Sequence, residues 1–139
     1  MTETKDLSPQ DALVAVMIAV SAADEEIRTA ELVQMSNVIN HLPVFAGYDA
    51  ARLPIMSEFV FGHFEQEDGL EKLFARIREA LPQRLWETAY ALSCDTAAAD
   101  GRIRETEARM LEEVRDELEI DRLHAAAIER GARARHMTL

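Results

Sequence analysis

The sequence predicts a single all-α domain of about seven helices. Apolar residues recur at the three- and four-residue spacing of helices along most of the 139 residues, and no segment shows the alternation of a strand. Two stretches, residues 22–31 and 98–107, also share their residue pattern at one constant offset. We therefore expect a compact domain over residues 8–131, built on two repeated helical hairpins, with flexible ends at 1–7 and 132–139.

The expected helices follow from local signals in the chain. The first begins after a serine that precedes a proline, a favourable start, and its apolar residues surround the helix and indicate burial. Asp68 should cap the fourth helix with Glu71 three residues on, and Gly131 should end the seventh. In order, the expected segments are Ser8 to Ala23, Leu32 to Leu42, Ala50 to Phe64, Leu70 to Leu81, Leu85 to Ala99, Leu111 to Leu118 and Asp121 to Arg130.

Composition excludes several classes of function. The formal charge of −11 disfavours binding to a phosphate backbone, so we expect no nucleic-acid partner and favour cations or basic proteins. The single cysteine, Cys94, permits no internal disulfide. The most apolar stretch, residues 12–23, is too short to span a bilayer, and the N-terminus lacks the pattern of a secretory signal. These features predict a cytoplasmic protein that does not span the membrane.

The stretch 100–107 matches the rear half of a calcium-binding EF-hand loop. Its acid, glycine, isoleucine and closing glutamate have the spacing of that loop. The front half does not match, because Thr96 and Ala98 stand where the loop needs its first oxygen ligands. One such stretch alone therefore provides too few ligands for a calcium ion.

Two stretches together make a metal site conceivable. Paired helical hairpins often pack around a twofold axis, which would bring Asp24, Glu31, Asp100 and Glu107 face to face at one end of the domain. Asp95, about one turn before the second stretch, would join or flank them. Carboxylates without histidine or thiolate favour a hard cation, so Ca²⁺ or Mg²⁺ with water in the remaining positions is the candidate ion.

The same acids also have a purely structural interpretation. An aspartate in a tight turn commonly accepts bonds from backbone N–H groups, and a glutamate in the first turn of a helix is favoured by the helix dipole. Ile27 and Ile103 are expected to anchor their loops in the core. Spacing alone leaves both interpretations of the acids open.

The sixth expected helix is strongly acidic. Most of these acids form like-charged pairs one turn apart, which destabilise an isolated helix slightly. A solvated face and a docking surface for a basic partner both explain them. The acidic residues are Glu112, Glu113, Asp116, Glu117 and Glu119.

The two stretches resemble the tellurite-resistance TerB family, and the likeness covers most of the chain. The motif Ala-Asp-Gly-x-Ile-x-x-x-Glu carries it, with Glu25 in place of glycine in the first stretch. The resemblance implies an all-helical fold, a divalent-cation site made by the loop acids, and cytoplasmic partners near the inner membrane surface in stress responses. Similar domains are also joined to DnaJ-type co-chaperone modules. The matching residues are Ala22, Ala23, Asp24, Ile27 and Glu31, then Ala98, Ala99, Asp100, Gly101, Ile103 and Glu107.

These observations lead to one functional hypothesis and two alternatives. The first is a noncatalytic stress-response domain that binds a divalent cation weakly through its acidic loops and engages a protein partner through its acidic surface, with any membrane association made through that partner. The second is a metal-free interaction module whose loop acids only cap helices. The third is an enzyme. The sequence contains no phosphate-binding loop, nucleophile motif or zinc-ligand spacing that would support it.

Overall fold

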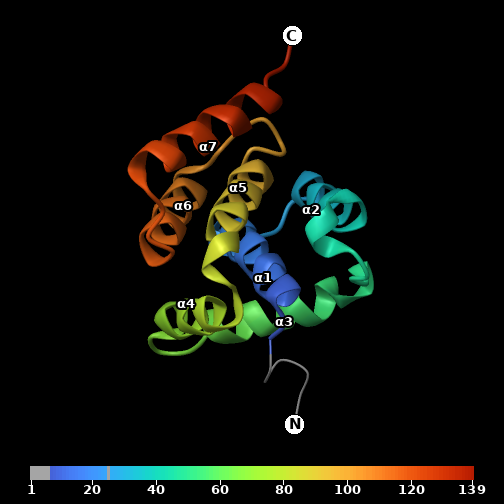
Figure 1. Cartoon of the computed structure of the whole chain (residues 1–139). Helices are drawn as coiled ribbons and strands as arrows, with labels where there is room; N and C mark the ends of the chain where they lie inside the picture. The colour runs from blue at the N-terminus through green and yellow to red at the C-terminus, as the bar shows by residue number, and fades with distance from the viewer. Residues whose placement is uncertain (1–6, 25) are drawn as a thin grey trace.

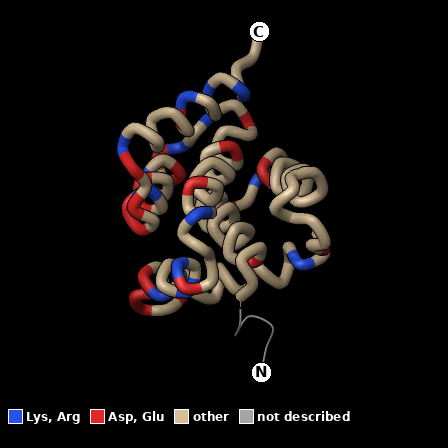
Figure 2. The backbone as a smooth tube through the Cα atoms, viewed as in Figure 1, with Lys and Arg blue, Asp and Glu red and all other residues tan. Residues whose placement is uncertain are grey.

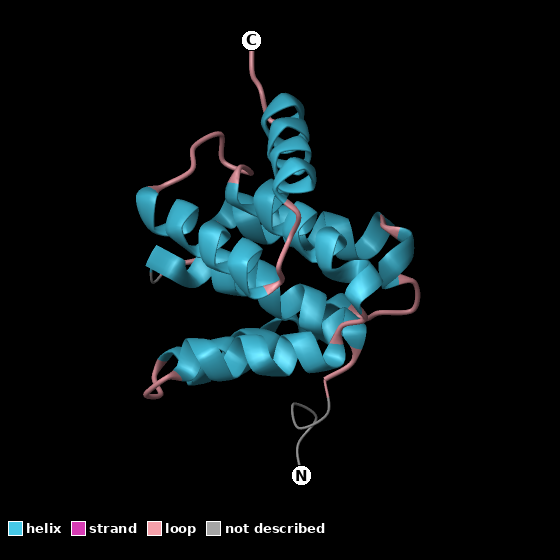
Figure 3. Ribbon diagram, turned by 60° about the vertical axis from the view of Figure 1, so that its left-hand side comes forward, coloured by secondary structure: helices cyan, strands magenta, loops and turns pink. Residues whose placement is uncertain are grey.

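A computed structural model describes residues 7–24 and 26–139, except for the side chain of Asp24. Within this part the chain forms seven α-helices with short 3₁₀ turns and no strand, which confirms the predicted all-α class (Figures 1 and 3). Residues 1–6, most of the end expected to be flexible, lie outside the described part. The helices are α1 Pro9–Ser21, α2 Thr29–His41, α3 Leu53–Phe64, α4 Gly69–Ala80, α5 Trp86–Ala97, α6 Glu105–Glu117 and α7 Arg122–Arg135.

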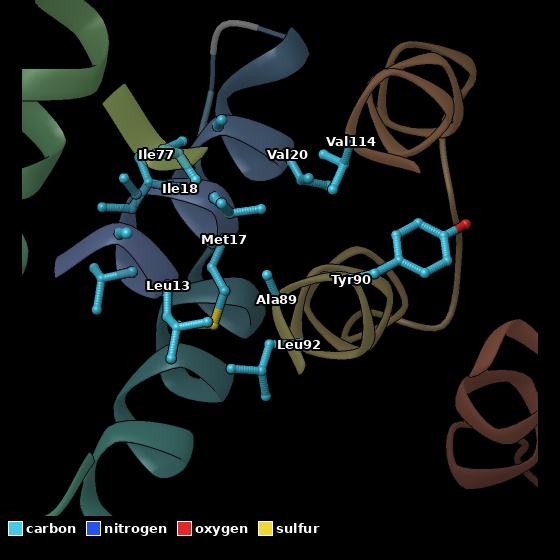
Figure 4. Close-up of a cluster of buried hydrophobic side chains, with 14 of the residues drawn as sticks. Leu13, Met17, Ile18, Val20, Ile77, Ala89, Tyr90, Leu92 and Val114 are labelled. Atoms are coloured by element: carbon cyan, nitrogen blue, oxygen red, sulfur yellow. The ribbon is translucent and has the colours of Figure 1, made fainter. Parts of the chain in front are cut away.

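Helix α1 lies at the centre of the molecule, with the other helices around it (Figure 1). Every residue from Asp11 to Ser21 is buried, so this helix has no solvent-facing side. It packs most extensively on α5 and α3, and also on α4 and α6. Figure 4 shows Leu13, Met17 and Ile18 of α1 among side chains from the surrounding helices. Burial on all sides explains why its apolar residues follow no single stripe.

The start of α1 is fixed by a buried carboxylate. Ser8 caps the helix by accepting a bond from the backbone N–H of Asp11, 2.9 Å away. The Asp11 side chain is itself only 5% exposed and receives bonds from Tyr48 Oη at 2.6 Å and Arg52 Nε at 3.0 Å. Burial raises the pKa of Asp11, but the bonds from Arg52, Tyr48 and the Ser8 backbone outweigh it and lower the pKa overall. This network attaches the segment before α3 to the first turn of α1.

One expected helix end is wrong, and one expected cap makes no side-chain bond. Asp68 directly precedes α4, as expected, but its backbone takes the left-handed conformation with φ of 56° and its side chain makes no capping bond. Gly131 does not end α7, which continues to Arg135. Ala132 is buried, and Arg135 bonds to Asp95 of α5, so tertiary contacts carry the helix past the glycine. The expected flexible tail therefore begins with a helical turn, and its flexibility beyond α7 stays a prediction.

The Asp11 network yields a stability prediction. Replacing Arg52 by Gln removes the cation that compensates a buried carboxylate, and we expect the free energy of unfolding to fall by about 2 kcal/mol at pH 7. The loss should narrow as the pH falls below the ordinary Asp pKa of 3.8, because a lowered pKa stabilises the fold only while the carboxylate is ionised. Urea denaturation of the wild type, Arg52→Gln and the exposed control Arg84→Gln measures this. Equal effects of the two substitutions would contradict it.

Candidate functional site: a buried pair of glutamates

The candidate site lies where two helix-to-helix turns meet. The first corner, residues 22–31, joins α1 to α2, and the second corner, residues 98–107, joins α5 to α6. The helices flanking the two corners end and begin at matching positions, with Arg28 and Arg104 as the residues before α2 and α6. The first corner contacts α6, and α2 contacts α5, so the two halves of the chain interlock here.

Each corner buries one glutamate completely. Glu31 and Glu107 occupy the third position of α2 and α6, and both are 0% exposed. In each case Oε1 accepts a bond of 3.1 Å from a backbone N–H, that of Arg28 for Glu31 and that of Arg104 for Glu107. These bonds satisfy N–H groups that a helix start otherwise leaves without a partner. The expectation that the loop acids cap helices is thus met by one oxygen of each glutamate.

The two glutamates face each other in the interior. No other group of the described chain donates to the second oxygen, Oε2, of either residue. Burial, and then the hydrogen bond with Glu107, raise the pKa of Glu31 to about 8, and the charges of Glu107 and Asp100 act in the same direction. At neutral pH the pair therefore holds a proton between its two carboxyl groups, because two ionised carboxylates cannot share a dry site cheaply.

Asp100 is held at the edge of this pair. Its Oδ1 accepts a bond from the Arg102 N–H at 3.1 Å, and its Oδ2 pairs with Arg104 Nη1 at 2.9 Å. Burial raises the pKa of Asp100, but these bonds and the charges of Arg104 and Arg28 lower it overall, so the carboxylate is ionised. Gly101 follows with φ of 81°, a left-handed conformation that favours glycine. The second corner thus places an anion and Arg104 beside the protonated pair, and Arg28 of the first corner acts on the same anion.

One expected anchor is wrong. Ile27 is partly buried against the core, as expected, but Ile103 is 48% exposed. The turn that Gly101 permits leaves residue 103 at the surface instead of directing it inward. The two corners therefore differ in what their isoleucines contact.

Asp95 serves a different contact. Its side chain is 15% exposed and bonds to Arg135 Nη2 at 2.7 Å, and His136 Nε2 lies 3.4 Å from the same oxygen. It thus links α5 to the end of α7. The structure does not bring it into a group with the corner glutamates, because no three acidic, histidine or cysteine side chains of the described residues lie together as metal ligands. The side chain of Asp24, the remaining predicted ligand, lies outside the described part.

Sequence reasoning assigned no role to Arg28 and Arg104. Each provides the backbone N–H that binds a buried glutamate, and their charges lower the pKa of Asp100. Their occurrence at matching places in both corners was the available signal. The buried pair Glu31 and Glu107 is therefore flanked by the pair Arg28 and Arg104.

Fold and site define an all-helical domain with acidic side chains at two matching helix corners. The chain belongs to the TerB family: residues 10–130 match the family described as tellurite resistance protein TerB. Searches of curated proteins and of solved structures returned no significant match. In the described part of the chain, no helix is long and apolar enough to cross a membrane.

The glutamate pair predicts an unusual pH dependence. Because the pKa of Glu31 is raised from 4.5 to about 8, its contribution to stability is complete at low pH and is lost as the pH rises through that window. Glu31→Gln keeps a hydrogen-bonding amide there without the charge. At pH 8.5 we expect the unfolding free energy of this variant to be higher than that of the wild type by a few kcal/mol, because one unit of pKa shift corresponds to about 1.4 kcal/mol. Near pH 5 the two unfolding free energies should be equal.

Thermal and urea unfolding between pH 5 and 8.5, with a chelator present, test this. Glu105→Gln is the matched control. Glu105 lies in the first turn of α6 together with Glu107, but its side chain is 81% exposed. Parallel pH profiles for Glu31→Gln and the wild type would show that the pair holds no shared proton.

Proposed function

We propose that this TerB domain is noncatalytic, binds a divalent cation weakly at its two corners, and engages a protein partner through its acidic surface in a cytoplasmic stress response. The observation that carries the cation proposal is the pair of fully buried Oε2 atoms of Glu31 and Glu107, which face each other without a donor from the rest of the described chain. Two carboxylates buried away from water need positive charge between them, and a bound cation can supply it in place of a proton.

The donor set suits Ca²⁺ or Mg²⁺. Glu31 and Glu107 offer carboxylate oxygens, and the corner acids Asp24 and Asp100 are the candidates to add to them. Asp100 would have to exchange its bond with Arg104 for the ion, which favours weak binding. Hard oxygen ligands in this number leave several positions to water. The bound ion would supply positive charge between carboxylates that otherwise require a proton.

The partner proposal depends on the acidic surface. Acidic residues gather on α6, whereas α4 carries Lys and Arg as well as acidic residues (Figure 2). Burial, then the hydrogen bond with Glu117 and the charges of Glu117, Asp116 and Glu71, raise the pKa of Glu113, so these carboxylates repel one another. A basic protein surface would relieve that repulsion and match the net charge of −11. Any membrane association would then be made through the partner.

Metal titration tests the cation proposal. We expect Ca²⁺ or Mg²⁺ to bind the wild type with a dissociation constant of about 0.1 to 1 mM, as weak oxygen sites do. An ion at ten times that constant should raise the unfolding free energy by about 1.4 kcal/mol. Isothermal titration calorimetry and thermal melts measure both quantities, with Zn²⁺ as the comparison ion.

The variants decide where the ion binds. Glu31→Gln with Glu107→Gln should abolish the heat of binding, Asp100→Asn should weaken it, and Glu105→Gln should leave it unchanged. Each melt is compared with and without metal, so that changes in intrinsic stability cancel. Unaltered binding in the double variant would overturn the site.

A second candidate function is a metal-free interaction module. The bonds from the Arg28 and Arg104 N–H groups to the two glutamates favour it, because they give both residues a structural task without any ion. This alternative predicts that chelator and metal leave the melting temperature of the wild type unchanged. The same melts therefore separate the two proposals.

A further inference from the structure

A cavity of about 430 Å³ lies between α5, α6, α7 and the second corner. This volume is in the range of small-molecule sites. Ala98, Leu111 and Ala132 contribute to its apolar walls, and Ile103 lines it as well. It lies apart from the glutamate pair, since neither Glu31 nor Glu107 lines it.

A hydrogen-bonded group forms one wall of the cavity. Tyr90 Oη donates to Glu129 Oε2 at 2.5 Å, and Arg115 Nη1 lies 3.4 Å from the same oxygen. Figure 4 shows Tyr90 extending from α5 away from α1. The charge of Glu129 is thus already compensated within the wall. Cys94 beside it is buried, and burial raises the pKa of its thiol to about 12, so it acts as an apolar wall residue.

The cavity lining includes two exposed arginines, in a protein of net charge −11. The side chains of Arg102 and Arg133 have no ion pair or hydrogen bond with the described residues. Glu112 is the one acid of the lining without a partner among the described residues. Beside these arginines, Ile103 is 48% exposed and Met137 is 71% exposed. Uncovered apolar side chains next to uncompensated arginines match a ligand with an apolar body and an anionic head.

We propose that this cavity binds a small apolar carboxylate, with its hydrocarbon body against Leu111 and Ile103 and its carboxylate at Arg102 and Arg133. The shared chemistry admits an acyl chain or an aromatic ring as the body.

Binding of decanoate, kept below its micelle concentration, tests the proposal. Methyl NMR should show saturable shifts at Ile103 and Leu111, and calorimetry gives the dissociation constant. Decanol and decylamine test whether the head group matters, and naphthoate tests a ring against a chain. We expect both carboxylates to bind at least about tenfold more tightly than the alcohol or the amine.

Three variants locate the site. The double variant Arg102→Gln, Arg133→Gln should bind decanoate about tenfold more weakly, because two exposed charge contacts contribute to affinity on that scale. Its affinity for decanol should be unchanged. Ala108→Phe should block the cavity from its exposed edge, whereas Arg130→Gln, on the same helix but outside the lining, should change nothing. Equal affinities for decanoate and decanol, no binding at all, or concentration-dependent dimerisation that alone perturbs Ile103 would each overturn the proposal.

Discussion

The burial of α1 from Asp11 to Ser21 is the constraint on which the rest of the structure depends. A helix without a solvent-facing side must be covered from every direction, and α3, α4, α5 and α6 provide that cover. From Asp11 to its last residue it lies in the interior, where polar groups need partners from the protein. Asp11 finds its partners in Tyr48 and Arg52. At the other end, the corner that follows α1 runs directly beside the start of α6.

This placement explains the glutamate pair. Helices α2 and α6 each bury the third residue of their first turn, and this glutamate accepts a bond from the backbone N–H of the residue before the helix. Because the two halves interlock, the two glutamates meet. Each glutamate caps its own helix, but tertiary packing brings the two carboxyl groups together. The resulting pair of like acids needs a proton or a cation between them. The raised pKa of Glu31 is a consequence of where the helix starts.

Much of the fold is readable from the sequence because apolar spacing dominates it. The uninterrupted apolar residues of α1 indicate its burial, and the capping signal at Ser8 gives its first residue correctly. Signals of a single residue were less reliable. Gly131 resembles a helix end, but the buried Ala132 and the bond from Arg135 to Asp95 outweigh its low helix propensity. Such contacts between distant helices leave no mark in local sequence.

The candidate site was predictable in its members but not in its burial. The spacing pointed to Glu31, Asp100 and Glu107, yet charged residues are rarely fully buried, and nothing local indicates that two of them lose all exposure while Asp100 keeps a partner of its own. Ile103 shows the reverse, an apolar residue that the turn leaves at the surface. Asp95 was placed by proximity along the chain, whereas its contacts are to α7.

The structural and the functional interpretations of the corner acids concern different atoms. Oε1 of each glutamate is committed to a backbone N–H, and it would keep that bond whether or not an ion is bound. Oε2 has no such commitment, and only the opposite carboxyl group faces it. Capping therefore does not compete with cation binding. It fixes the position of both side chains, so that the two Oε2 atoms, which accept no bond from an N–H group, are held in place in the interior. The proposed weak cation site, completed by water, requires such an arrangement.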